Sequence, residues 1–159
     1  MDKDIIHKGG CGCGAVRFEA YGEPTRTVVC HCRYCQTRTG SAFGANVYFA
    51  DEKVQFSGEM KTYVFTNNAD RSFTNWFCPT CATTVAWAVG LRHGWTGIAM
   101  GAFDPPTFWA TPDAEIFCRS RAPFIETTSA DQDETSGYYD PKHAERDGLQ
   151  LDLPAIAGV

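Results

Sequence analysis

The chain has 159 residues, of which 43% are apolar and 13% aromatic, a composition typical of one compact domain and unlike that of disordered or collagen-like chains. The formal net charge is −5 and the pI is near 5.3, so the positive field that a nucleic acid requires is missing, and we expect no nucleic-acid partner. The first ten residues contain two Asp and two Lys but no apolar run, which predicts no targeting peptide and therefore a cytoplasmic protein.

Apolar and polar residues alternate with a period of two in three segments, and this alternation predicts β-strands. In chain order these segments are 16–20, 62–66 and 84–89. Shorter apolar runs between Gly, Pro, Asn and Asp turns predict further strands at 28–30, 45–49, 54–56, 71–77, 96–102 and 115–119. No long segment of the sequence has helical periodicity, so we expect an all-β fold.

Residues 72–91 contain no Asp, Glu, Lys or Arg, and the length of this run alone would suit a membrane span. Its interior, however, includes Asn75, Pro79, four threonines and two cysteines. In a bilayer, each unsatisfied polar group would cost several kcal/mol. The run therefore predicts two buried strands around a turn, and we expect no membrane association.

The C-terminal part differs in composition from the rest. From 126 to 137 the chain reads ETTSADQDETSG, which is polar and acidic, as in surface arms and linkers. We therefore divide the chain into a cysteine-bearing β domain at 1–125 and a polar arm at 126–159. Within the arm, Leu149 to Leu153 would add one edge strand.

The cysteines favour metal binding over disulfides. Eight of 159 residues are cysteine, or about 5%, which is below the roughly 8–10% of disulfide scaffolds. A disulfide framework stays the lesser alternative. Seven of the eight fall into tight clusters, namely Cys11 and Cys13; Cys30, Cys32 and Cys35; and Cys78 and Cys81.

The spacing within each pair suits one metal ion. In Cys78-Pro-Thr-Cys81, a tight turn aims both sulfurs at the same point, as in zinc ribbons. In Cys11-Gly-Cys13, the period of two of an extended chain points both sulfurs to one side. Together the two pairs supply the four ligands of a structural site that would join segments more than sixty residues apart.

The middle cluster, Cys30-His-Cys32-Arg-Tyr-Cys35, supplies three thiolates and leaves a fourth coordination position to water or substrate, as in catalytic zinc sites. Two alternatives stay open from the sequence. The first cysteine pair could instead close a site with two of the middle three. Alternatively, both sites could be structural, with Cys118 or a histidine as the fourth ligand.

Three ordered motifs, GGCGCGAVRF at 9–18, CHCRYC at 30–35 and FCPTC at 77–81, resemble the glutathione-dependent formaldehyde-activating enzyme family, which is grouped with centromere protein V. The resemblance covers about residues 7–125 and is weaker in its later part. It implies an all-β, β-tent fold of several coiled antiparallel sheets clamped by zinc. It also implies carbon–sulfur lyase chemistry.

The resemblance assigns two zinc ions, in agreement with the spacing. The structural ligands are Cys11, Cys13, Cys78 and Cys81, and those of the second, catalytic zinc are Cys30, Cys32 and Cys35. Three positions depart from the family pattern: Ala82 stands where glycine is usual, Glu115 where histidine is frequent, and Phe124 where tryptophan is frequent. The ligands are unaffected, but Glu115 would add negative charge if it lay near a site for an acidic thiol.

A zinc ion held by three thiolates suits a soft ligand such as a substrate thiol. The implied function is a zinc-dependent carbon–sulfur lyase or synthase that acts on glutathione or a similar small-molecule thiol, forming S-hydroxymethylglutathione from formaldehyde. Arg33 and Arg38 flank the middle cluster and are the candidate partners of the thiol's carboxylates, with Arg33 preferred. We expect His31, between two ligands, to point away from the sulfurs.

Two further functions are compatible with the sequence. One is a non-catalytic carrier of glutathione or its adducts, which would bind the thiol without turnover. The other is a structural zinc scaffold that binds another protein. A homo-oligomer is compatible with each of them.

Overall fold

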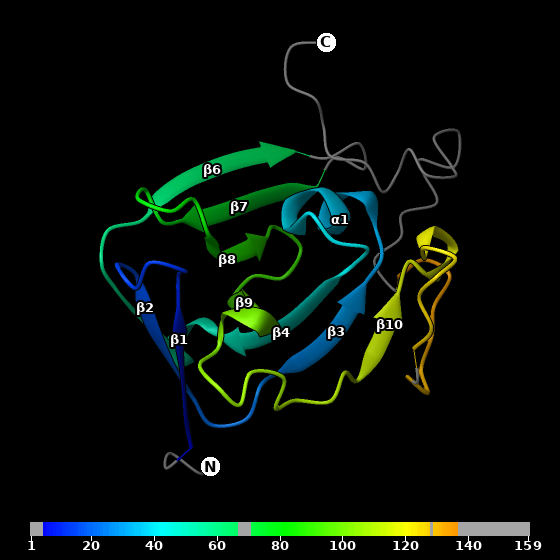
Figure 1. The fold of residues 1–159 in the computed structure, drawn as a ribbon, viewed down its shortest axis with the longest axis horizontal. Coiled ribbons are helices and arrows are strands. Elements are labelled where there is room, and N and C mark those ends of the chain that lie inside the picture. Colours follow the sequence, from blue (N-terminus) through cyan, green and yellow to red (C-terminus); the bar gives the residue numbers. More distant parts are fainter. Residues whose placement is uncertain (1–4, 67–70, 128, 137–159) are drawn as a thin grey trace.

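The structure is a computed structural model and describes residues 5–66, 71–127 and 129–136. Its strands form two sheets (Figure 1). The smaller sheet is antiparallel, with the order β1 (Ile6–Gly10), β2 (Arg17–Tyr21), β5 (Val54–Ser57). The larger sheet has seven strands in the order β10 (Ala114–Ile116), β3 (Arg26–Cys30), β4 (Gly44–Ala50), β9 (Trp95–Ala99), β8 (Thr84–Val89), β7 (Ser72–Phe77), β6 (Lys61–Thr66).

Helical structure is brief in the described residues. The helix α1 (Arg33–Thr39) has seven residues, and 3-10 turns occur at η1 (Asp51–Lys53), η2 (Met100–Ala102) and η3 (Cys118–Ser120). The predicted all-β class with several sheets is therefore confirmed. None of the helices in the part of the chain that the structure describes is long and apolar enough to cross a membrane.

Each strand predicted within the described residues has a counterpart, and the uncharged run forms β7 and β8 as expected. The strands predicted at 96–102 and 115–119 end early, because η2 and η3 begin there. Besides the 3-10 turns, two elements were not predicted. The strand β1 carries two adjacent glycines and little apolar alternation, and α1 is too short to show a helical period.

One strand pair departs from the expected antiparallel arrangement, because β10 runs parallel to β3. Residues 131–135 lie beside β10: Glu115 N donates to Asp131 O at 2.9 Å, and Phe117 N donates to Thr135 O at 2.7 Å. The beginning of the predicted arm therefore packs along the sheet. The edge strand predicted at 149–153 lies outside the described residues.

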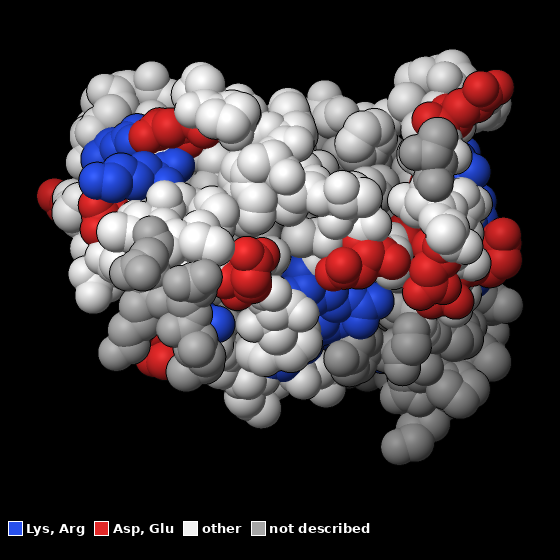
Figure 2. Space-filling model, turned by 90° about the horizontal axis from the view of Figure 1, so that it is seen from below, with Lys and Arg blue, Asp and Glu red and all other residues white. Residues whose placement is uncertain are grey.

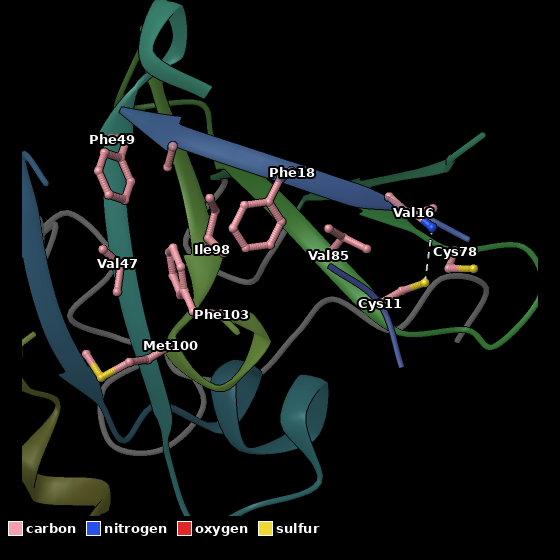
Figure 3. Packing of buried hydrophobic residues seen from close by; sticks show 11 residues of the cluster. Cys11, Val16, Phe18, Val47, Phe49, Cys78, Val85, Ile98, Met100 and Phe103 are labelled. Carbon is pink, nitrogen blue, oxygen red and sulfur yellow. Dashed lines mark hydrogen bonds between the residues drawn. The ribbon is translucent and has the colours of Figure 1, made fainter. Parts of the chain in front are cut away.

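The main core lies between the two sheets (Figure 3). Apolar side chains of β2 face those of β4 and β9, and Phe18, Phe49 and Ile98 are buried. Phe18 also meets Phe103 edge to face, with 5.1 Å between ring centroids. Each such burial contributes about 1.5–3 kcal/mol. Position 9 requires glycine, because a Cβ on Gly9 would lie 2.3 Å from the Phe18 ring.

The opposite face of the larger sheet carries α1, which lies between β7 on one side and β3 and β4 on the other (Figure 1). The register places Tyr48, Gly97 and Trp87 side by side on β4, β9 and β8, and Asn75 of β7 follows Trp87. The Trp87 ring covers Gly97, where a Cβ would lie 2.3 Å from its Nε1 atom. From α1, the Tyr34 hydroxyl donates to Asn75 Oδ1 at 2.8 Å. The helix is thereby fixed to this face.

Charged groups of both signs lie side by side on the face shown in Figure 2. In the structure, Lys8 Nζ lies 2.9 Å from Glu19 Oε1, and Arg17 pairs with Asp104. Such exposed pairs contribute little to stability. Among the described residues on this face, Lys and Arg side chains are interspersed with Asp and Glu.

Candidate metal centres

Four cysteine sulfurs from two distant segments meet at the ends of two strands. Cys11 and Cys13 follow β1, and Cys78 and Cys81 lie between β7 and β8. All four Sγ atoms lie within 4.8 Å of one another, and Cys13 Sγ is 3.6 Å from that of Cys11 and 3.7 Å from that of Cys78. A tetrahedral zinc ion with Zn–S bonds of about 2.3 Å separates its sulfurs by about 3.8 Å. The donor set and its spacing therefore fit a metal ion.

Short hydrogen bonds shape both of these cysteine loops. In the first loop, Gly14 N donates to Cys11 O at 3.1 Å, and Val16 N donates to Cys11 Sγ at 3.2 Å. In the second loop, Ala82 N donates to Cys78 O at 2.9 Å. Ala82 has a φ of 58°, a left-handed conformation that glycine adopts without strain.

Thr83 connects the two loops. Its hydroxyl oxygen accepts a hydrogen bond from Gly12 N at 3.2 Å and lies 3.2 Å from Cys81 Sγ. The hydrogen bond to this hydroxyl, together with hydrogen bonds from the backbone of Thr83 and Cys13, lowers the pKa of Cys81 to about 5, which favours the thiolate that a metal ion binds. The two loops belong to different sheets, so an ion at this cluster would join the sheets. Because Cys11 and Cys13 meet Cys78 and Cys81 here, the alternative prediction, in which the first pair shares a metal site with two cysteines of the middle cluster, is wrong.

The remaining three clustered cysteines meet where β3 runs into α1. Cys30 ends β3, Cys32 is the N-cap of α1, and Cys35 lies in its first turn. Their sulfurs lie within 4.8 Å of one another, and all three residues are buried. Cys35 N donates to Cys32 Sγ at 3.4 Å, so the capping interaction that begins the helix also orients a sulfur.

The three buried thiols of this cluster disfavour one another's ionisation, so a bound cation is needed for all three to be thiolates. Hydrogen bonds from Cys30 and Cys32 hold the pKa of Cys35 well below its usual value. The contacts with Cys32 and Cys35, together with burial, raise the pKa of Cys30 well above its usual value. Three buried sulfurs therefore ionise together only when a positive charge compensates them. A thiolate-binding metal ion fits this requirement.

Within the described residues, no fourth His, Cys, Asp or Glu atom joins the three sulfurs. His31 is completely buried and its Nε2 lies 2.5 Å from Glu115 Oε1, so its side chain points away from the cluster, as expected. Cys118 Sγ lies 3.7 Å from the backbone oxygen of Glu115 and belongs to neither cluster. Among the described side chains, therefore, none closes the fourth coordination position of an ion held here.

The two arginines predicted to bind substrate occupy different places. Arg33 is exposed on the first turn of α1 and donates to a glutamine of the same helix. Arg38 is half-buried, with its guanidinium carbon 3.7 Å from the Trp87 ring centroid, and its Nη2 donates to Asn46 Oδ1 at 2.9 Å. Its charge and a hydrogen bond to Cys35 also help to lower the pKa of that thiol. Arg38, and not Arg33, is therefore the cation held against the three-cysteine cluster.

The residues that hold Arg38 were not predicted as part of the site. Neither Trp87 nor Asn46 was singled out from the sequence. The available signal in the sequence was Asn46 itself, an amide within the otherwise apolar strand predicted at 45–49. In the structure Asn46 is 1% exposed in the middle of β4. A buried amide needs hydrogen-bond partners, and here they are Arg38 and the backbone oxygen of Gly44.

Comparisons with known proteins bear on the family and the fold of this chain. The family model for the glutathione-dependent formaldehyde-activating enzyme matches residues 6–120. Among solved structures, the crystal structure of a Rhodobacter sphaeroides protein, a structural genomics target, is similar with a TM-score of 0.50 and 20% identity. The similarity covers 66% of this chain and 97% of that chain, and at this identity it concerns the fold alone. No curated protein matches the chain significantly.

Proposed function

This chain belongs to the glutathione-dependent formaldehyde-activating enzyme family, and on that premise we propose that it is a zinc-dependent carbon–sulfur lyase or synthase. Its substrate is glutathione or a similar thiol, and the adduct is S-hydroxymethylglutathione, formed from formaldehyde. The observation that carries the proposal is the three-cysteine cluster. Its sulfurs lie within 4.8 Å of one another and no fourth described side chain completes the set.

Zinc bound to Cys30, Cys32 and Cys35 would supply a Lewis acid with one open position, which favours the thiolate form of an incoming thiol at neutral pH. The three cysteines hold this centre at the junction of β3 and α1, where burial keeps bulk water away from the sulfurs. In the synthase direction a carbon–sulfur bond forms and the carbonyl π bond breaks. The proton of the thiol ends on the former carbonyl oxygen, so no electron acceptor is required.

Arg38 orients the thiol substrate in this proposal. The guanidinium is fixed by Trp87 and Asn46, so less side-chain entropy is lost when it binds a carboxylate. Glutathione carries two carboxylates, and a cation beside Cys35 offsets their repulsion by the thiolates. Arg33, exposed on the same helix, has no contact with the sulfurs among those described and is the weaker candidate.

The four-cysteine cluster has a structural role in this proposal. Zinc at Cys11, Cys13, Cys78 and Cys81 would clamp the loop after β1 to the loop between β7 and β8. Its four sulfurs leave no open position, which is the property of structural zinc. The clamp joins the two sheets at a place where two of the cysteines are exposed and the apolar core ends.

Proton NMR exchange spectroscopy tests the proposed reaction, because it measures the rate at which glutathione and S-hydroxymethylglutathione interconvert at equilibrium. We expect the native protein to increase this rate in proportion to its concentration. The Cys32→Ser variant should lose the increase, and Cys118→Ser, which alters a cysteine outside both clusters, should keep it. No increase at any protein concentration would contradict the lyase. Calorimetric binding of glutathione without any rate increase would instead identify a carrier.

A further inference from the structure

Four aromatic rings form a continuous row that ends at the three-cysteine cluster. We call Tyr63, Phe65, Phe73 and Tyr34 the aromatic row. Tyr63 stacks on Phe65 with 5.6 Å between ring centroids, and Phe65 stacks on Phe73 at 5.2 Å with an angle of 7° between the ring planes. Tyr34 closes the row at 4.7 Å from Phe73 and 5.0 Å from Phe65.

The strand register produces this row. Phe65 of β6 pairs directly with Phe73 of β7, and Tyr63 pairs with Asn75. Residues two apart on a strand point to the same face, so Tyr63, Phe65, Phe73 and Asn75 share the face on which α1 lies. The hydrogen bond from Tyr34 to Asn75, at 2.8 Å, fixes the inner end of the row.

The row leads from the protein surface to the sulfurs. Tyr63 is 51% exposed at its outer end, Phe65 and Phe73 are half-buried, and Tyr34 is 8% exposed. Phe65, Phe73 and Phe117 all pack against the buried group that contains Tyr34 and the three cysteines. Solvent-accessible aromatic surface therefore adjoins the proposed reaction site.

A one-carbon aldehyde gives such a surface nothing to bind. Formaldehyde adds a single CH₂OH group to a thiol, and that group would lie at the sulfur. Stacked rings that are half open to solvent instead favour a flat apolar group, because aromatic contacts add about 0.5–1.5 kcal/mol beyond the burial of apolar area. Packing of α1 does not account for the exposed ring of Tyr63, which stacks on Phe65, because Tyr34 is held by Phe65, Phe73 and Asn75.

We propose that the aromatic row binds the apolar group of larger aldehydes, so that the enzyme also makes and cleaves glutathione thiohemiacetals of aryl-bearing aldehydes. This inference rests on the proposed function, since it uses the same three-cysteine centre and the same bond changes. The thiol sulfur bonds to the aldehyde carbon, the carbonyl π bond breaks, and the thiol proton is transferred to the oxygen. Nothing is oxidised or reduced.

The test compares phenylacetaldehyde with acetaldehyde, which differ by one phenyl group. Proton NMR exchange spectroscopy measures how much the native zinc-loaded protein accelerates the interconversion of glutathione and each aldehyde adduct. The formaldehyde adduct is measured in parallel. We expect the acceleration for phenylacetaldehyde to exceed that for acetaldehyde by about tenfold, the size of a well-formed aromatic contact. The Phe73→Leu variant, which keeps apolar volume but loses the ring, should bring this ratio close to one.

Two further variants make the test specific. Tyr63→Ala changes only the exposed outer end of the row and should lower the ratio without a folding defect. Phe56→Leu changes an aromatic residue of the smaller sheet, whose ring centroid lies 6.2 Å from that of Phe18. It should leave unchanged both the ratio of the two accelerations and the acceleration for formaldehyde. A ratio near one in the native protein, with formaldehyde exchange accelerated, would overturn this inference alone. If no adduct exchanges faster, the proposed function fails and the inference fails with it.

Discussion

The Nε2 atom of His31 lies 2.5 Å from Oε1 of Glu115, and neither side chain is exposed. The pair joins the end of β3 to β10. Arg121 Nε lies 3.2 Å from the same carboxylate oxygen, and the Thr127 hydroxyl donates to the other one. The charge of Glu115 is therefore compensated by its own partners and is not directed at the thiol site.

Replacing Glu115 by Gln should destabilise the protein most at neutral pH. Burial alone would raise the pKa of Glu115, but hydrogen bonds from Thr127 and His31 and the charge of Arg121 outweigh it and lower the pKa. A lowered carboxyl pKa stabilises the fold above the unfolded value of about 4.3, and this contribution is lost as the pH falls through the folded value. Removing one partner of a buried pair typically costs about 3–5 kcal/mol.

Urea unfolding of native protein and the Glu115→Gln variant, measured from pH 7 to pH 3, checks this expectation. The difference in the free energy of unfolding should be large at pH 7 and should shrink steadily towards pH 3. Glu59→Gln, at an exposed position, serves as the control and should change stability by less than about 0.5 kcal/mol. A difference that stays constant with pH would show that the carboxylate charge is not what stabilises this pair.

The two cysteine clusters should respond differently to the loss of a sulfur. Elemental analysis of the native protein should give two zinc ions per chain. Cys32→Ser should give one with the fold kept, because the four-cysteine cluster stays complete. Cys78→Ser, which removes a sulfur from the cluster between the sheets, should be largely unfolded by circular dichroism, since structural zinc binding is coupled to folding. Loss of both ions in the Cys32 variant would contradict independent sites.

The metal centres were the part of the molecule most accessible from the sequence, because C-x-C and C-x-x-C spacings restrict sulfur positions locally. The strands were accessible for a similar reason, since a period of two persists over five or six residues, as in Tyr63 and Phe65 of β6. The prediction that the first and last cysteine pairs share one site came from counting ligands. It rested on the family resemblance as much as on the spacing.

The surroundings of the three-cysteine cluster were not accessible in this way. Arg38 lies near Trp87 only because the register of β8, β9 and β4 places Trp87 and Asn46 on one face of the sheet. Strand register cannot be read from the spacing of residues in one sequence. The seven-residue helix α1 starts from a sulfur cap at Cys32, which propensity does not reveal. Arg33 lies inside the cysteine motif in sequence, but its exposed side chain donates to Gln36 of the same helix.

Arg38 and Arg33 form a matched pair for testing substrate binding. Arg38→Ala should weaken glutathione binding at least about tenfold, because a hydrogen-bonded charge pair contributes about 1.5–3 kcal/mol. Arg33→Ala should change the dissociation constant by less than about twofold, as expected for an exposed arginine. Isothermal titration calorimetry with zinc-loaded protein measures both, and elemental analysis confirms equal metal content. Equal losses in the two variants would show that net charge, and not the held guanidinium, attracts the thiol.

Ala82 should be a position where glycine is better than the natural residue. Its φ of 58° brings the Cβ close to its own carbonyl oxygen, which costs about 1–2 kcal/mol for a residue other than glycine. Glycine relieves that strain but also gains entropy in the unfolded chain.

Ala82→Gly should therefore raise the free energy of unfolding by about 0.5–1 kcal/mol, measured by urea unfolding with zinc bound. Ala88→Gly, within β8, is the matched control and should lower it by about 0.5–1 kcal/mol, because no left-handed strain is relieved there. The Ala82 variant should also release zinc more slowly to a chelator, since a relaxed turn keeps Cys78 and Cys81 in place without distortion. If both substitutions destabilise the protein equally, the backbone immediately after Cys81 stores no strain at position 82.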